Sequence, residues 1–245
     1  MNWPIPLLPA RFIRRDNRFR AVVEMDGRLL PAHVPNSGRL GELFTPGAAV
    51  WVAPADASAA RKTACDLALV EYAGVLVSVD ARLPNRLAAE ALAAGRLAAL
   101  AGYSQIQPEV RVGGSRLDFL LSGGSDPARP RCWLEIKSVT LVEKGCALFP
   151  DAPTTRGVKH LEELATLRRA GERVAVSFVV QRSDVRRFRP HPTADPAFAA
   201  SLRRAHAHGV EVYAWRCAVS QNGIELTDPL PVDLDINPAV EASNA

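Results

Sequence analysis

Charged side chains interrupt two short apolar runs between residues 115 and 140, and this feature limits the possible folds most strongly. The runs read Ser-Arg-Leu-Asp-Phe-Leu-Leu and Cys-Trp-Leu-Glu-Ile-Lys-Ser-Val-Thr, with a polar stretch rich in Gly, Ser and Pro between them. This pattern predicts a β-hairpin. Because successive strand residues point to opposite faces, Glu135 and Lys137 share one face, and we expect Asp118 on the same side. The opposite, apolar face would hold Leu117, Phe119, Leu121, Leu134 and Ile136.

Two carboxylates and a lysine on one strand face suit metal-dependent hydrolysis of phosphodiester bonds. Asp118 and Glu135 can hold a hard cation such as Mg²⁺ or Mn²⁺ through their oxygens. Lys137 can orient or activate a water beside a phosphate that the cation polarises. The arrangement resembles the core of PD-(D/E)xK nucleases, although Leu117 stands where that family often has Pro. In this interpretation the backbone carbonyl of Ile136 is a further metal ligand. The alternative is an ion-paired cluster on a solvated strand face.

The composition is that of an ordinary globular protein, with 48% hydrophobic and 23% charged residues in 245. The sequence contains no apolar run long enough to cross a membrane, and the early prolines near residue 1 are not typical of a signal peptide. We therefore expect a cytoplasmic protein without a membrane partner. The four cysteines lack zinc spacing, which favours reduced, buried thiols. The net charge of +4 permits nucleic-acid binding without proving it.

Residues 1–82 are predicted to form a small β-barrel, because short apolar runs alternate with turn signals such as Asp26-Gly27. An OB-like barrel is our first choice, and this fold often binds single strands. The expected strands cover residues 11–15, 20–25, 29–34, 48–53, 67–71 and 75–79.

Basic residues cluster at the start of this barrel. Arg14, Arg15 and Arg18 alternate with Phe12 and Phe19, so they could follow a phosphate backbone while the rings stack on bases. The alternative is a solvated arginine face above two core phenylalanines.

A turn-rich loop after residue 32 carries three further candidates for contacts with nucleic acid. His33, Asn36 and Arg39 lie in a segment of Pro, Asn, Ser and Gly, which could approach phosphate. A lone histidine is more often a structural residue, and that alternative stays open for His33.

Residues 83–238 are predicted to form a second domain, and residues 239–245 a polar tail. The order of elements is α-β-β-β-α-β-α-β, a mixed sheet flanked by helices, so the fold class is α+β or mixed α/β. In the first helix, over 83–97, Glu90 falls beside the apolar stripe and could reach the acids as a third carboxylate. The alternative is a surface ion pair between Arg86 and Glu90.

The next predicted helix, over 156–170, begins with basic residues. Arg156, Lys159 and His160 oppose the helix dipole there, so a phosphate nearby would relieve them. The alternative is pairing with neighbouring acids. Gln181 follows a buried strand over 173–180, at a strand end where α/β folds often place binding groups.

Many motifs occur in an order that resembles the sugar fermentation stimulation protein A (SfsA) family. The resemblance implies an OB-like domain followed by a PD-(D/E)xK nuclease-like domain, DNA binding, and a link to regulation of maltose and other sugar metabolism. It places Asp118, Glu135 and Lys137 on the nuclease triad, and Glu90 on a helix-borne acid. Val34, Ser37 and Pro153 depart mildly from the family pattern. The matching motifs are Ile13-Arg-Arg, His33-Val-Pro-Asn-Ser-Gly, Leu83-Pro-Asn-Arg, Gly114-Ser-Arg-Leu-Asp-Phe, Glu135-Ile-Lys-Ser-Val-Thr-Leu, Phe149-Pro-Asp-Ala, Arg156-Gly-Val-Lys-His-Leu and Val180-Gln-Arg.

Two functions therefore stand beside each other. The first is a DNA-binding nuclease that depends on Mg²⁺ or Mn²⁺. The second is a non-catalytic DNA-binding regulator with little sequence preference, and a sugar-binding module is a third idea supported only by the family name. RNA or single strands are alternative partners, and the oligomeric state is open, with a homodimer as one alternative.

Overall fold

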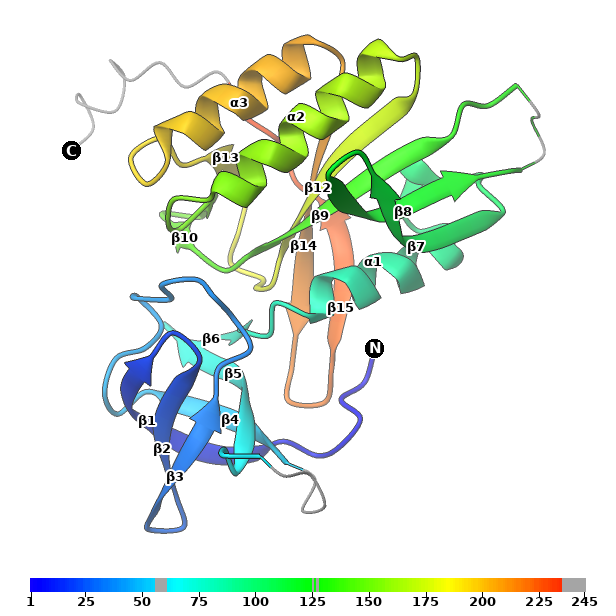
Figure 1. The fold of residues 1–245 in the computed structure, drawn as a ribbon. Coiled ribbons are helices and arrows are strands. Elements are labelled where there is room, and N and C mark those ends of the chain that lie inside the picture. The colour runs from blue at the N-terminus through cyan, green and yellow to red at the C-terminus, as the bar shows by residue number, and fades with distance from the viewer. Residues whose placement is uncertain (56–60, 125, 127, 235–245) are drawn as a thin grey trace.

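A computed structural model describes residues 1–55, 61–124, 126 and 128–234 of the chain (Figure 1). The predicted fold class is confirmed: a closed OB-like barrel precedes a mixed sheet with helices. The barrel strands run in the order β3-β2-β1-β4-β5-β6, and a pairing between β3 and β5 closes them. Their bounds are β1 Leu8–Asn17, β2 Arg20–Met25, β3 Arg28–His33, β4 Ala49–Pro54, β5 Cys65–Tyr72 and β6 Val75–Ser78.

The barrel forms because its alternating apolar residues point inward. Phe12 is buried and its ring stacks on Phe44 with centroids 4.9 Å apart. The predicted Asp-Gly turn joins β2 to β3, and Gly27 has a φ of 72°, which glycine adopts without a steric penalty. Of the two phenylalanines beside the arginines, Phe12 is therefore a core residue.

The second domain is built on a six-stranded sheet with the order β15-β14-β12-β9-β8-β7. Strands β9, β12 and β14 are parallel to one another, and β7, β8 and β15 pair antiparallel with their neighbours. The elements are α1 Leu83–Ala93, a short 3₁₀ helix η1 Ala98–Leu100, β7 Gln105–Val112, β8 Ser115–Ser122, β9 Cys132–Val139, α2 Thr155–Arg169, β12 Arg173–Val180, α3 Pro196–Ala207, β14 Glu211–Val219 and β15 Ile224–Pro229.

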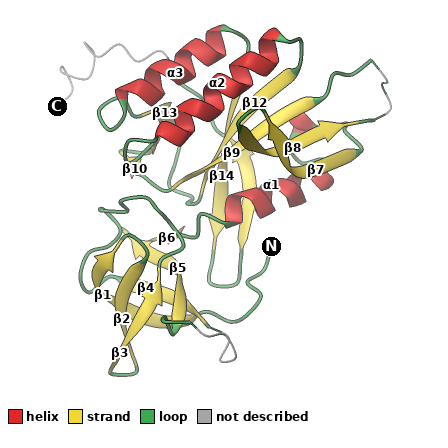
Figure 2. Ribbon diagram, in the orientation of Figure 1, coloured by secondary structure: helices red, strands yellow, loops and turns green. Residues whose placement is uncertain are grey.

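Helices cover both faces of this sheet (Figure 2). Helix α1 packs with Phe119, Leu134 and Ile136 on one face, whereas α2 and α3 pack with Leu120 and Trp133 on the other. The alternative of an ion-paired cluster on a solvated strand face is therefore wrong, because α2 and α3 cover this face and Glu135 is buried.

The expected apolar face is wrong at one position. Leu117 lies in the core under α2 and α3, whereas Phe119 and Leu121 lie under α1. The alternation of β8 is thus interrupted at Asp118, between these two cores.

A small second sheet was not expected from the sequence. It has the order β10-β11-β13, formed by β10 Val142–Glu143, β11 Cys146–Phe149 and β13 Arg187–Pro190. All four cysteines are buried and free, as predicted. Within the described residues, no helix has the length and apolar character needed to cross a membrane. The predicted tail, residues 239–245, lies outside the described part of the chain.

Polar side chains join the two domains. Gln181 accepts a hydrogen bond of 3.2 Å from the Ser78 hydroxyl of the barrel. Asp151 accepts one of 2.7 Å from the backbone N–H of Arg39. The loop between β3 and β4 is therefore held against the second domain.

Candidate functional site

Strands β8 and β9 separate where the two acids lie. Their backbone pairing ends at Phe119 and Leu134, although the same register would next place Asp118 opposite Glu135. Instead, the backbone N–H of Ile136 donates to Asp118 Oδ2 across 2.7 Å. A side-chain carboxylate thus takes the place of a strand carbonyl, and the acids line the resulting opening.

Asp118 is held from two directions. Its Oδ1 accepts a hydrogen bond of 2.7 Å from the side-chain amide of Asn85, in the first turn of α1. Burial raises the pKa of Asp118 to about 6, and the negative charge of Glu135 adds to this effect. The hydrogen bonds from Ile136 and Asn85 and the charge of Lys137 oppose it. Two partly desolvated carboxylates therefore repel each other at this opening.

Glu135 has one engaged oxygen and one free oxygen. The residue is 3% exposed, and Oε1 contacts Lys137 Nζ at 2.6 Å and the His160 ring. Within the described chain, Oε2 is buried and has no hydrogen-bond partner. Burial alone would raise the pKa of Glu135, but the hydrogen bond from His160 and the charge of Lys137 outweigh it, so the pKa lies below its usual value.

His160 of α2 is part of this network, whereas the sequence interpretation placed it on the nucleic-acid surface. The residue is 4% exposed, which leaves little of it for a ligand. Arg156 Nε donates to His160 Nε2 across 3.4 Å, and Lys137 Nζ lies 3.3 Å from His160 Nδ1. The same Nδ1 atom contacts Glu135 Oε1. Helix α2 takes this position because Thr154 caps it, accepting a hydrogen bond of 3.0 Å from Gly157 N–H.

Glu90 does not join the two acids. Its half-exposed carboxylate lies 3.5 Å from the N-terminal amine of Met1. Residues five positions apart on a helix point about 140° away from each other, so α1 directs Asn85, and not Glu90, at Asp118. Among the described residues, no three Asp, Glu, His or Cys side chains are grouped so that they could hold a metal. The expected third carboxylate is therefore replaced by the Asn85 amide, which lies in the quoted Leu83-Pro-Asn-Arg motif but carried no assigned role.

Arg15 uses its guanidinium for hydrogen bonds within the barrel domain instead of presenting it to solvent. Its guanidinium lies between the β1–β2 turn and the loop after β3. The Cζ atom of this group lies 5.2 Å from the centroid of the Phe44 ring. Burial lowers the pKa of Arg15. These contacts leave Arg15 poorly placed to bind a phosphate. The backbone carbonyls that accept its hydrogen bonds are those of Asn17, Arg18, Asn36, Gly38 and Arg39.

Three other predicted contact residues make internal contacts, Asn36 and Gln181 as buried residues and His33 as a partly exposed one. Asn36 is 8% exposed; its amide donates to Val79 O at 3.0 Å, and its Oδ1 accepts from Gly38 N–H. His33 Nδ1 lies 3.4 Å from Asp66 within the barrel. Gln181 is fully buried between the domains and donates to Ser138 Oγ at 3.0 Å.

The remaining predicted basic residues are exposed. Arg14 pairs with Asp16 at 3.0 Å, and Lys159 donates to Gly114 O at 2.7 Å. The side chains of Arg18 and Arg39 have no hydrogen bond or ion pair within the described residues, and Arg156 extends from the start of α2. Arg18, Arg39, Arg156 and Lys159 therefore remain available for phosphate contacts.

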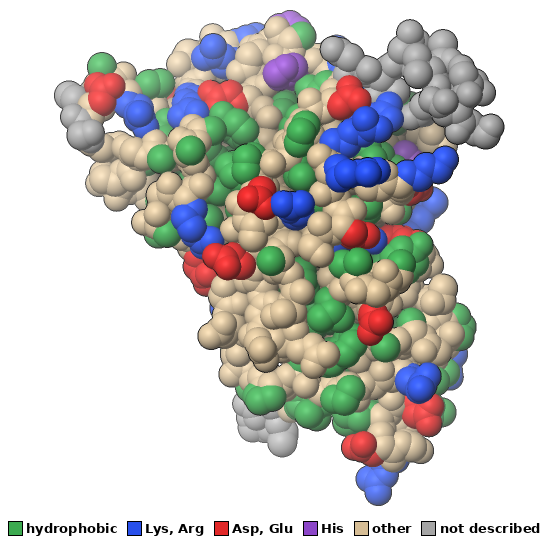
Figure 3. Space-filling model, turned by 180° about the vertical axis from the view of Figure 1, so that it is seen from behind, with side chains coloured by type: hydrophobic (Ala, Val, Ile, Leu, Met, Phe, Trp, Pro, Cys, Tyr) green, Lys and Arg blue, Asp and Glu red, His purple; other side chains and the backbone are tan. Residues whose placement is uncertain are grey.

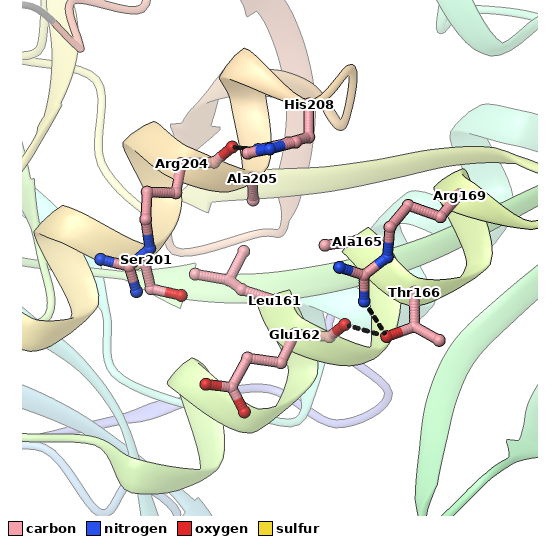
Figure 4. Close-up of a pocket in the computed structure, with 9 residues that line it drawn as sticks. All are labelled: Leu161, Glu162, Ala165, Thr166, Arg169, Ser201, Arg204, Ala205 and His208. Atoms are coloured by element: carbon pink, nitrogen blue, oxygen red, sulfur yellow. Dashed lines mark hydrogen bonds between the residues drawn. The ribbon is translucent and has the colours of Figure 1, made fainter.

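Two other surfaces lack the paired acids found between β8 and β9. A groove of about 380 Å³ between α2 and α3 is lined by Glu162, Arg169, Arg204, His208 and five uncharged side chains (Figure 4). It has one carboxylate, so it lacks the paired acids of the opening. The barrel face seen in Figure 3 carries few charged side chains, and thus does not form a continuous basic surface.

Comparison with known proteins gives consistent matches across both domains. A family model described as the SfsA N-terminal OB domain matches residues 13–79, and one described as the sugar fermentation stimulation protein RE domain matches residues 82–223. A sugar fermentation stimulation protein homolog of Moorella thermoacetica is 47% identical, with 94% of this chain and 98% of that protein covered. The homolog of Chloroflexus aurantiacus is 48% identical, with coverages of 93% and 86%.

A solved structure has the same fold. It is the structure of Pyrococcus furiosus SfsA in complex with Ca²⁺, with a TM-score of 0.85 and 33% identity. The match covers 95% of this chain and 98% of that one.

Proposed function

Because this chain belongs to the sugar fermentation stimulation protein (SfsA) family, and because its paired acids line an opening in the sheet, we propose that it is a DNA-binding nuclease dependent on Mg²⁺ or Mn²⁺. The observation that carries the proposal is the free oxygen of Glu135. Oε2 is buried beside a second carboxylate, Asp118, and no donor within the described residues reaches it. A buried carboxylate oxygen without a donor is costly unless a cation binds it.

The donor set fits a hard divalent cation. Asp118, Glu135 and the backbone carbonyl of Ile136 would supply the oxygen ligands that Mg²⁺ and Mn²⁺ prefer. The raised pKa of Asp118 supports this assignment, since a cation would relieve the repulsion that burial and Glu135 cause. The Ca²⁺ complex of the Pyrococcus furiosus relative also supports a divalent cation. When bound, the cation would polarise the scissile phosphate and stabilise the oxygens of an in-line displacement.

Lys137 and its neighbours would position the reactants. The ammonium group of Lys137 is fixed on Glu135 at 2.6 Å, so it can hold an attacking water next to the acids. His160 holds Glu135 from the other side, and Asn85 holds Asp118. These contacts fix both carboxylates before the substrate arrives, which reduces the reorganisation needed in the transition state.

DNA would be held by the exposed basic side chains near the opening. Arg156 and Lys159 come from α2, which also carries His160, and Arg39 comes from the loop that Asp151 holds. Such phosphate contacts give affinity that depends strongly on salt and little on sequence.

One observation favours a second function, a non-catalytic DNA-binding regulator of sugar metabolism. Glu135 Oε1 is already bound by both Lys137 and His160, and Glu90 contributes no third carboxylate. In that case Asp118 and Glu135 would contribute to stability or bind a cation without cleaving DNA, and the exposed basic side chains would bind the DNA.

The two functions separate in a cleavage assay. Single- and double-stranded DNA and RNA are incubated with the full chain and Mg²⁺ or Mn²⁺, alongside Asp118→Asn and the matched acid control Glu90→Gln. The proposal expects metal-dependent cleavage by the wild type and by Glu90→Gln, and its loss in Asp118→Asn. Equal inactivity of all three on every substrate would leave the regulator as the better account.

A further inference from the structure

One aromatic side chain of the barrel lies on the surface. Phe19 is 50% exposed at the tip of the turn between β1 and β2, whereas Phe12, in the neighbouring strand, is 1% exposed. The pairing of Asn17 with Arg20 leaves Arg18 and Phe19 as the two residues of this hairpin turn. A half-exposed phenyl ring gains little from burial, so the packing of the barrel does not explain why Phe stands here.

The turn that carries Phe19 is fixed by hydrogen bonds. Asn17 Oδ1 accepts from Phe19 N–H at 2.9 Å, and Phe19 O accepts from Val34 N–H at 2.9 Å. Arg15 also donates to Arg18 O at 2.6 Å. The ring therefore stands on a preorganised support, which lowers the entropy lost when it binds a ligand.

Arg18 adjoins Phe19 in the turn, and Arg39 belongs to a loop that Arg15 ties to this turn. The Arg15 guanidinium donates to the carbonyls of both Arg18 and Arg39, so the β1–β2 turn and the loop after β3 lie side by side. Within the described residues, neither Arg18 nor Arg39 has a side-chain partner. An exposed ring on a surface that also carries unpaired guanidinium groups matches a base and its adjoining phosphates.

This surface borders the second domain. The backbone N–H of Arg39 donates to Asp151, shortly before α2 begins. A small cavity of about 30 Å³ is lined by Asn36 of the same loop and by Ser138, which directly follows Lys137. The β2–β3 turn, by contrast, lies at the end of the barrel far from the second domain (Figure 1).

We propose that Phe19 stacks on an unpaired base of a single strand while Arg18 and Arg39 contact the phosphates on either side. This inference rests on the proposed nucleic-acid function and narrows its substrate class. The substrate would carry a single-stranded segment next to the bond at the acids, because the same loop approaches both places. A fully paired duplex offers Phe19 no open base face.

The test measures binding without cleavage. Each variant is made in the full Asp118→Asn chain, and fluorescence anisotropy gives its Kd for a short oligothymidylate and for a duplex. Phe19→Ala should weaken single-strand binding by about 5- to 150-fold, the range expected for one lost base stack. Phe19→Trp should restore binding, with quenching of the new indole by the oligonucleotide. Duplex affinity should stay the same.

Leu29→Ala is the matched control, because Leu29 is another exposed apolar side chain, 61% exposed, near the far end of the barrel. It should leave single-strand affinity unchanged. A second control replaces the thymines by abasic sites, which should lower wild-type affinity to the level of Phe19→Ala.

The stacking site is overturned if Phe19→Ala leaves the Kd for the single strand unchanged. It is also overturned if Phe19→Ala weakens binding to the duplex and to abasic strands as much as it weakens binding to the oligothymidylate. Thermal unfolding of Phe19→Ala checks that the barrel is intact. Cleavage by the otherwise wild-type chain is scored separately. If single-strand binding depends on Phe19 but no cleavage is seen, the nuclease proposal alone is refuted. If the protein cleaves but Phe19→Ala leaves single-strand binding unchanged, the stacking site alone is refuted.

Discussion

The side-chain amide of Asn85 donates a hydrogen bond of 2.7 Å to Asp118 Oδ1, and so ties the first turn of α1 to the opening between β8 and β9. The other oxygen of Asp118 accepts from Ile136 N–H at 2.7 Å. The carboxylate is thus oriented by a helix on one side and by a strand on the other. It is also desolvated, which makes its charge costly when no cation is bound.

Removing the charge of Asp118 should stabilise the metal-free protein at neutral pH. Burial, followed by the charge of Glu135, raises the pKa of Asp118 to about 6, whereas an unfolded Asp titrates at about 3.9. Between these values the folded state binds more protons than the unfolded state. The contribution of Asp118 to the free energy of unfolding therefore falls as the pH rises through this window. We expect Asp118→Asn to raise the free energy of unfolding at neutral pH by about 1–3 kcal/mol, measured by urea denaturation with a chelator.

Glu135→Gln is the contrasting variant, because the pKa of Glu135 lies below its usual value. Its charge contributes stability above the ordinary pKa of Glu, and this is lost as the pH falls through the folded-state value. Glu135→Gln should therefore destabilise the protein at neutral pH. Added Mg²⁺ or Mn²⁺ should stabilise the wild type more than Asp118→Asn. Identical stability of wild type and Asp118→Asn at every pH, with and without metal, would count against the paired-acid site.

Lys137→Ala should separate cleavage from binding. Lys137 contacts Glu135 and is mostly buried, so it is placed for the reacting water and not for the DNA backbone. We expect the cleavage rate to fall by about 10²- to 10⁴-fold, with Kd for DNA changing little. The matched control is Lys62→Ala, an exposed lysine of the barrel domain. A parallel loss of binding and cleavage in Lys137→Ala would instead make Lys137 a DNA contact.

Arg15 should be needed for the stability of the barrel more than for binding. Its guanidinium donates to backbone carbonyls on two segments, so Arg15→Ala should lower the free energy of unfolding by about 1.5–3 kcal/mol. Arg15→Lys should not restore this, because an ammonium lacks the planar fork of donors. Arg14→Ala removes an exposed pair with Asp16 and should cost less than about 1 kcal/mol. Equal urea midpoints for Arg14→Ala and Arg15→Ala would contradict the structural assignment.

Arg18 and Arg39 should contribute to the salt dependence of binding. Each has an unpaired, exposed guanidinium within the described residues. Replacing both by Ala should reduce the slope of log K against log salt by about 1.4 for a single strand, since each phosphate contact contributes about 0.7. The slope is measured by anisotropy titrations at several salt concentrations. An unchanged slope would remove these arginines from the binding surface.

Much of the fold could be predicted because local patterns and tertiary structure agree. The barrel strands follow from turn signals such as Asp26-Gly27, and α2, Thr155–Arg169, lies within one residue of the helix predicted over 156–170. The small sheet of β10, β11 and β13 was missed because its strands are two to four residues long and carry no repeated alternation.

Some of the geometry of the candidate site follows from the sequence, whereas its detailed contacts do not. Glu135 and Lys137 share a strand face, which alternation alone determines. The choice of Asn85 over Glu90 depends on how α1 is rotated against the sheet, and only tertiary packing sets that angle. The interruption of β8 at Asp118 likewise depends on a hydrogen bond to Ile136 N–H, which no local pattern indicates. The role of Arg15 was hidden because its carbonyl acceptors come from two separated segments.

The central claim is that Asp118 and Glu135 hold a divalent cation. The most direct measurement is the anomalous scattering of Mn²⁺ in crystals of the full chain soaked with that ion. The account predicts one strong peak between the Asp118 carboxylate and Glu135 Oε2, absent from crystals of Asp118→Asn. A saturating soak that leaves this position empty, or that gives the same peak in Asp118→Asn, would contradict it.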